Sequence, residues 1–152
     1  MDFVIQATKQ TRSNCLNLIK DLSSDQLNFI PEGYNNNLIW HVGHMFVSEQ
    51  ILCYSRSNTP LVVPETYLSL FRKGTSPREW TSKPDIKEVI HYMNLTSEAL
   101  EADYHNKRFG VFTEYATSSG VVLKTIEGAI IYSYGHENLH FGNIISMIKL
   151  IR

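Results

Sequence analysis

Residues 37–54 have the sequence NLIWHVGHMFVSEQILCY, and this stretch gives the clearest indication of the fold class. Its apolar residues recur on most sides of a helix with 3.6 residues per turn, which is typical of a helix that other elements surround. Asparagines occupy positions 35–37, and an asparagine side chain can accept hydrogen bonds from the free N–H groups at a helix start. We therefore predict a buried helix from Leu38 to about Tyr54.

Three further helices are predicted by apolar residues at helical spacing in stretches free of proline. The first runs from Phe3 to about Leu22, the third begins near Pro84, and the fourth follows Thr125 as its N-cap. Four such helices bury their apolar faces against one another. The predicted fold class is therefore all-α, a four-helix bundle in which residues 1–152 are a single domain.

The connections are also predicted from local sequence. Four of the five prolines fall between positions 60 and 84, so residues 58–83 are a long crossover between the second and third helices. One short helix is expected inside it, started by Pro64 and stopped by Gly74. Residues 109–123 are aromatic, β-branched and interrupted by Ser118-Ser119-Gly120, which predicts a loop with a small hairpin.

The composition excludes several classes of protein. Fourteen basic and fifteen acidic residues give a formal charge of −1 without a basic cluster, so nucleic-acid binding is not expected. No apolar run approaches the roughly 18 residues of a membrane span, and the first residues lack the pattern of a secretory signal. Cys15 and Cys53 lie in apolar stretches without metal-binding spacing, which predicts free buried thiols. We expect a cytoplasmic protein with no membrane partner.

The strongest functional signal is a pair of histidines, His136 and His140, in the predicted fourth helix. Residues four apart leave one face of a helix about 6 Å apart along its axis, so one metal ion can bridge both rings. A third imidazole from His41 or His44 would complete the ligand set, and the spacing does not choose between these two. Three neutral nitrogen ligands leave a position for water, as in catalytic zinc-type sites.

Other side chains near the histidines have weaker assignments. His91 and His105 lack a partner at ligand spacing and are assigned to the surface. Glu137 points about 100° away from its neighbour His136, so it either orients a ligand histidine by accepting that ring's second N–H or is a solvated surface charge. Three polar side chains are expected on the ligand face, namely Ser48, Ser133 and Asn143. Three glycines flank the ligand candidates and allow close helix approach or leave room for a bound species, namely Gly43, Gly135 and Gly142.

Two segments resemble the signature segments of the DinB-like family. They are residues 36–44 (NNLIWHVGH) and 136–142 (HENLHFG), and residues 26–31 (QLNFIP) and 72–75 (RKGT) extend the resemblance. The resemblance implies a bacterial four-helix bundle, often a dimer, that holds a divalent metal, commonly zinc or nickel, on three histidines. In this chain the matching ligands are His44, His136 and His140. Close relatives often have asparagine at the position of His41, which favours His44.

The resemblance also implies a class of reaction. Characterised relatives include transferases that use the thiols mycothiol or bacillithiol, whereas many others have no assigned reaction. The leading hypothesis is therefore a metal-dependent transferase or hydrolase that activates water or a low-molecular-weight thiol and works on a small molecule. The alternatives are a helical bundle that binds metal without catalysis and a helical interaction module whose histidines fill the core.

Overall fold

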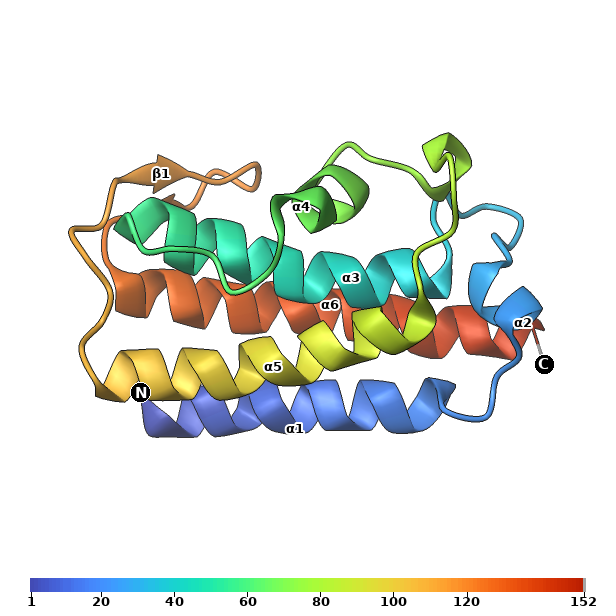
Figure 1. The fold of residues 1–152 in the computed structure, drawn as a ribbon, viewed down its shortest axis with the longest axis horizontal. Coiled ribbons are helices and arrows are strands. Elements are labelled where there is room, and N and C mark those ends of the chain that lie inside the picture. The colour runs from blue at the N-terminus through green and yellow to red at the C-terminus, as the bar shows by residue number, and fades with distance from the viewer. Residues whose placement is uncertain (152) are drawn as a thin grey trace.

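Four long helices lie side by side in the structure, a computed structural model that describes residues 1–151 (Figure 1). They are α1 (Asp2–Ile19), α3 (Leu38–Glu49), α5 (Ile86–His105) and α6 (Ile126–Ile151). Both α1 and α3 contact α5 and α6, so each long helix packs against two others. The chain is mostly helical, as predicted. Within residues 1–151, no helix combines the length and the apolar character needed to cross a membrane.

The first helix ends earlier than predicted, at Ile19 rather than near Leu22, and a short helix α2 (Ser24–Asn28) follows it. A capping box starts α2: the Ser23 hydroxyl accepts a hydrogen bond from the Gln26 backbone N–H, and the Gln26 side chain accepts one from the Ser23 N–H. The chain leaves the α1 axis to begin this second helix.

The predicted central helix is confirmed, and every residue of α3 is buried. Asn37 caps it, because its side-chain oxygen accepts a hydrogen bond of 2.8 Å from the Trp40 N–H. The same helical path continues through a π-helical turn at Gln50–Tyr54 and a 3₁₀ turn at Ser55–Ser57. The helical stretch therefore extends slightly beyond the predicted end near Tyr54.

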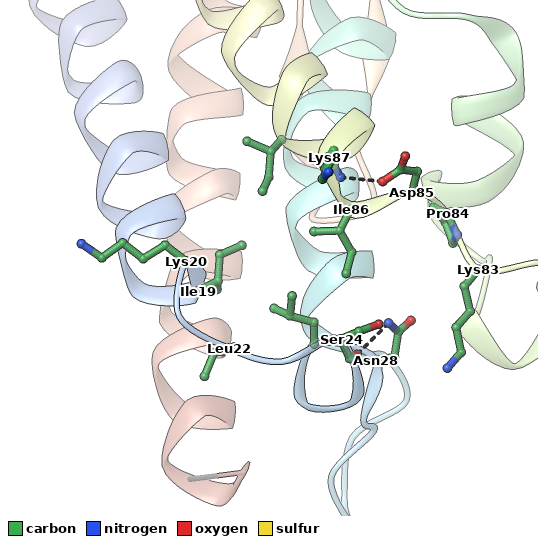
Figure 2. A pocket seen from close by; sticks show the side chains of 12 residues that line it. Ile19, Lys20, Leu22, Ser24, Asn28, Lys83, Pro84, Asp85, Ile86 and Lys87 are labelled. Atoms are coloured by element: carbon green, nitrogen blue, oxygen red, sulfur yellow. Dashed lines mark hydrogen bonds between the residues drawn. The ribbon is translucent and has the colours of Figure 1, made fainter.

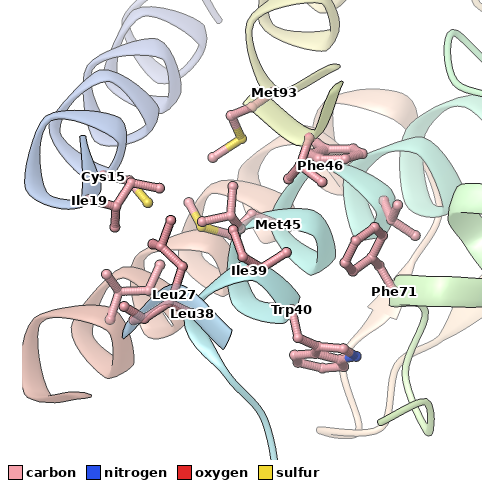
Figure 3. Close-up of a cluster of buried hydrophobic side chains, with 14 of the residues drawn as sticks. Cys15, Ile19, Leu27, Leu38, Ile39, Trp40, Met45, Phe46, Phe71 and Met93 are labelled. Atoms are coloured by element: carbon pink, nitrogen blue, oxygen red, sulfur yellow. The ribbon is translucent and has the colours of Figure 1, made fainter. Parts of the chain in front are cut away.

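The largest apolar cluster gathers around α3, with side chains from several other helices (Figure 3). Cys15 and Ile19 enter it from α1, Met93 from α5, and Phe71 from α4 (Glu65–Phe71). Because these helices all bury apolar side chains on α3, they determine which of its faces remains for polar residues.

The connecting segments largely follow the predictions. The short helix α4 follows Pro64 inside the crossover, which also contains a 3₁₀ turn at Pro77–Glu79. The predicted hairpin is a two-stranded antiparallel sheet of β1 (Tyr115–Ala116) and β2 (Val122–Leu123). This small sheet is the one departure from an all-α chain among the residues that the structure describes. Figure 1 shows it above the start of α6.

Candidate metal site

The structure brings together the three histidines that the sequence singled out, His44 from α3 and His136 and His140 from α6. One nitrogen atom from each ring lies within 4.8 Å of the others. His44 and His140 are buried, and His136 is partly exposed. This group could hold one metal ion.

The spacing of His136 and His140 suits two ligands of one ion. Their Nε2 atoms lie 3.2 Å apart. Two nitrogen ligands at about 2.0–2.1 Å from a tetrahedral zinc ion are separated by about 3.3 Å. The other ring nitrogen of His136, Nδ1, is buried without a hydrogen-bond partner among the described residues. The pair therefore already has nearly the nitrogen separation that a shared ion requires.

The orientation of His44 is fixed by the crossover. Its Nδ1 lies 2.6 Å from the backbone oxygen of Phe71, at the end of α4. A carbonyl oxygen only accepts hydrogen bonds, so Nδ1 carries the proton and Nε2 has the lone pair. Gly43 allows this approach, because a Cβ atom there would overlap the Phe71 ring. At Gly135 and Gly142 a Cβ would meet nothing within 4 Å, so close approach is confirmed at Gly43 alone.

Burial keeps these imidazoles neutral. Desolvation lowers the pKa of His44 to about 4, despite the hydrogen bond to Phe71, and it also lowers the pKa of His136. Desolvation and the neighbouring histidines lower the pKa of His140 to about 2. At neutral pH each ring therefore has one nitrogen lone pair, the form in which histidine binds metals.

His41 lies beside the group of three rather than within it. Its Nδ1 is 2.9 Å from the Nδ1 of His140, and its ring is buried. Burial lowers the pKa of His41 to about 4. Spacing alone could not choose between His41 and His44. The structure groups His44, not His41, with the two histidines of α6.

The remaining polar assignments have mixed outcomes. Ser48 is on the ligand face as predicted, with its hydroxyl oxygen 3.2 Å from the His44 Nε2. Ser133 is buried, but its hydroxyl has no hydrogen-bond partner among residues 1–151. His91 and His105 are exposed on α5, which confirms their assignment to the surface.

Both alternatives for Glu137 were wrong. Its carboxylate is fully buried and accepts two hydrogen bonds from Arg12, one from Nε at 2.9 Å and one from Nη2 at 2.6 Å. The same guanidinium also donates to Glu49 at 2.6 Å. Glu137 therefore belongs to a buried ion network that joins α1, α3 and α6. No local sequence pattern predicts this ion network, because Arg12 lies 125 positions away from Glu137.

A small pocket of about 110 Å³ opens on the histidine group. His44 and His136 line it, together with Lys73 from the crossover and Tyr115 from β1. The complete set of further lining residues is Ser48, Ile51, Leu52, Thr117, Ser118 and Tyr132. The lining residues from the hairpin region were not predicted, because nothing in their local sequence indicates that the hairpin lies beside α3 and α6.

A larger pocket of about 440 Å³ lies elsewhere, where the end of α1, α2 and the start of α5 meet (Figure 2). No histidine is among its lining residues. Its one carboxylate, Asp85, caps α5 by accepting a hydrogen bond of 2.8 Å from the Lys87 N–H. This pocket lacks a ligand set, so the small pocket beside the histidines is the better candidate site.

Comparison with known proteins places the chain in a family. No curated protein matches the sequence. A sequence model of the DinB superfamily matches residues 7–144, a stretch that contains the three grouped histidines and reaches into all four long helices. Because this match covers most of the chain, the protein belongs to the DinB superfamily.

Proposed function

We propose that the protein is a divalent-metal-dependent enzyme in which His44, His136 and His140 hold zinc or nickel. The observation that supports this function is a group of three neutral imidazoles next to a pocket. Neutral ligands leave the charge of a bound ion uncompensated, so the ion would lower the pKa of a water or thiol that reaches it.

The residues around the pocket have separate roles in this proposal. Phe71 holds His44 in the tautomer that directs the Nε2 lone pair away from α4. The Ser48 hydroxyl lies beside that nitrogen and lines the pocket, so it can hydrogen-bond to a group that enters. Tyr115 and Tyr132 contribute aromatic surface that limits the access of water.

The pocket suggests a small substrate that carries an anionic group. Its volume of about 110 Å³ admits only a few non-hydrogen atoms, so the rest of a larger molecule would lie outside. Lys73 lines the pocket, whereas no carboxylate is among the lining residues. A lysine and a divalent cation together favour a negatively charged ligand. We propose thiol transfer or hydrolysis as the reaction, with a low-molecular-weight thiol as one substrate.

Metal analysis of protein purified without a histidine tag tests the site. We expect about one divalent ion per chain in the wild type and a large loss in His140→Ala. His91→Ala is the matched control, because His91 is an exposed histidine on α5 and should not affect metal content. Equal metal content in the two variants would contradict the ligand assignment.

Activity separates the two metal-binding hypotheses. We expect the metal-loaded protein to accelerate transfer of a thiol to an electrophile, and His136→Ala to lose this activity. Full metal occupancy without acceleration of thiol transfer or hydrolysis would support the non-catalytic metal-binding bundle. A wild type that binds no metal would support the interaction module.

The proposal extends to the architecture and the assembly. We propose that the four long helices constitute a four-helix bundle, that residues 1–152 are one domain, and that the protein acts in the cytoplasm as a homodimer. Light scattering of the purified protein would measure the oligomeric state.

A further inference from the structure

The contact between His41 and His140 has its own chemistry. The two Nδ1 atoms face each other at 2.9 Å, and both rings are buried. This separation is a hydrogen-bond distance, so one nitrogen donates a proton and the other accepts with its lone pair. A neutral imidazole has one N–H, and the position of that proton decides which nitrogen remains available as a ligand.

The second nitrogen of His140 determines which ring is the donor. His140 Nε2 faces His136 Nε2 at 3.2 Å, inside the group of three. If this atom binds an ion it must have a free lone pair, and the single proton of His140 must then lie on Nδ1. His140 Nδ1–H therefore donates to His41 Nδ1, and His41 carries its own proton on Nε2.

We propose that His41 is a positioning residue for His140 and not a metal ligand. Its Nδ1 accepts a hydrogen bond from His140 Nδ1–H, which fixes the tautomer of that ring and prevents its rotation away from His44 and His136. This inference rests on the proposed function, because it assumes that His140 binds the ion. Hydrogen bonds of this kind are general at protein metal sites, and their loss weakens metal binding about 10–100-fold.

The surroundings of His41 favour this role. Its backbone is part of α3, in which every residue is buried, so the ring is attached to a rigid element. The Trp40 ring is nearly perpendicular to it, with ring centroids 5.5 Å apart. Its Nδ1 is already directed at His140, whereas His44 Nδ1 is occupied by the Phe71 carbonyl. Each histidine of α3 thus has a distinct hydrogen-bond partner.

Two substitutions separate positioning from packing. In His41→Asn the side-chain oxygen lies the same number of bonds from the backbone as Nδ1, so an acceptor remains. His41→Leu has no acceptor but retains apolar bulk. We expect His41→Asn to bind zinc within about threefold of the wild type, and His41→Leu to bind it about 10–100-fold more weakly. Circular dichroism of each variant would report whether it folds.

Nitrogen-15 NMR of the zinc-loaded wild type gives a direct readout that needs no variant. We expect His140 to be protonated on Nδ1 and His41 on Nε2, with slow solvent exchange of the His140 Nδ1 proton. That proton should exchange faster in His41→Leu and remain slow in His41→Asn. Protonated His41 Nδ1 in the zinc-loaded wild type would overturn the inference, even if His41→Leu failed to fold.

The remaining outcomes are distinguishable. A wild type that binds no zinc would defeat the proposed function, and this inference with it. Equal zinc affinity of His41→Leu and the wild type would overturn the positioning role alone and leave the three-histidine site intact. Loss of zinc in both His41 variants, with His44→Ala unaffected, would make His41 the ligand in place of His44.

Discussion

Replacing Arg12 with methionine removes the cation at the centre of the buried ion network. The guanidinium lies in α1 and is 1% exposed. Its Nε and Nη2 donate hydrogen bonds to Glu137, and Nη2 also donates to Glu49. Its Nη1 donates to the hydroxyls of Thr96 and Ser97 at 3.0 and 3.1 Å. Its five N–H donors therefore all have partners. Methionine retains the apolar stem and leaves two carboxyl groups without the charge that faces them.

The expected loss of stability is large because the network is dry. Breaking a buried ion pair by removing one partner costs about 3–5 kcal/mol. For a chain of this length, a loss of about 4 kcal/mol lowers Tm by about 8–16 °C. Urea and thermal unfolding followed by far-UV circular dichroism would measure both quantities for Arg12→Met.

Lys9→Met is the matched control in the same helix. Lys9 lies one turn before Arg12 and forms ion pairs with Glu98 and Glu101 at 2.9 and 2.7 Å. The Glu98 side chain is 70% exposed, so solvent screens this cluster. We expect Lys9→Met to shift the unfolding midpoint much less than Arg12→Met. Equal shifts in the two variants would contradict the larger contribution expected of the buried network.

The pH dependence gives a second check on the same network. Burial raises the pKa of Glu49 to about 7, although Arg12 opposes this, so Glu49 takes up a proton as the pH falls through about 7. A folded-state pKa above the ordinary 4.5 stabilises the protein at low pH, and this contribution is lost as pH rises from 4.5 through about 7. Without Arg12 the carboxyl groups repel more strongly once ionised. Arg12→Met should therefore lower the free energy of unfolding more at pH 8 than at pH 5.5. An equal decrease at the two pH values would contradict repulsion between the carboxylates as the cause.

Three further predictions concern the site and its support. Burial lowers the pKa of His44 to about 4, and burial with the neighbouring histidines lowers that of His140 to about 2. Protonation of each of these two rings should therefore weaken zinc binding by less than about twofold between pH 7 and 5. An ordinary pKa of about 6.5 would give about 25-fold per ring, and calorimetric titration distinguishes the two results. Gly43→Ala should destabilise the protein by about 1–3 kcal/mol, because its Cβ would overlap the Phe71 ring. Gly142→Ala, in open space within α6, should be neutral or stabilising by up to about 1 kcal/mol in the same thermal unfolding assay. Lys73→Gln should weaken binding of mercaptoacetate to cobalt-substituted protein about fivefold, as expected for the loss of an exposed ion pair of about 1 kcal/mol. The same substitution should leave binding of neutral 2-mercaptoethanol unchanged. Equal effects on the two thiols would contradict the proposal of an anionic substrate.

Much of the fold was predictable because its signals are local. The N-cap at Asn37, the apolar surroundings of α3 and the proline before α4 each involve only a few neighbouring residues. The capping box at Ser23 and Gln26 is equally local, but α2 has only five residues and lacks an apolar period that would reveal it. The predicted first helix therefore extended too far, into the turn that separates α1 from α2.

Residue spacing alone predicted the site only where its residues share one helix, and the choice of His44 came from the family resemblance. The spacing of His136 and His140 predicts their proximity, and the structure brings both together with His44. Spacing could not separate His41 from His44, because residues three apart share a helix face. The two histidines differ in their hydrogen-bond partners, because the Phe71 carbonyl from the crossover contacts His44 Nδ1. Such contacts depend on how elements pack, and a single sequence contains no local pattern for them.

The ion network and the histidine group share the helices α3 and α6, and this connects the stability of the fold with the proposed metal site. Glu137 follows His136 in α6, and its two hydrogen bonds to Arg12 fix the rotation of α6 about its axis. Successive helical residues lie about 100° apart, so a carboxylate held toward α1 directs the preceding imidazole toward α3. Glu49 has a similar relation to His44 in α3, about 140° further round that helix, and the same guanidinium holds it. Apolar residues in place of a buried ion network often give equal or greater stability. They would not fix the rotation of both helices as a bidentate guanidinium does, so the network suits a fold that must align histidines from two helices.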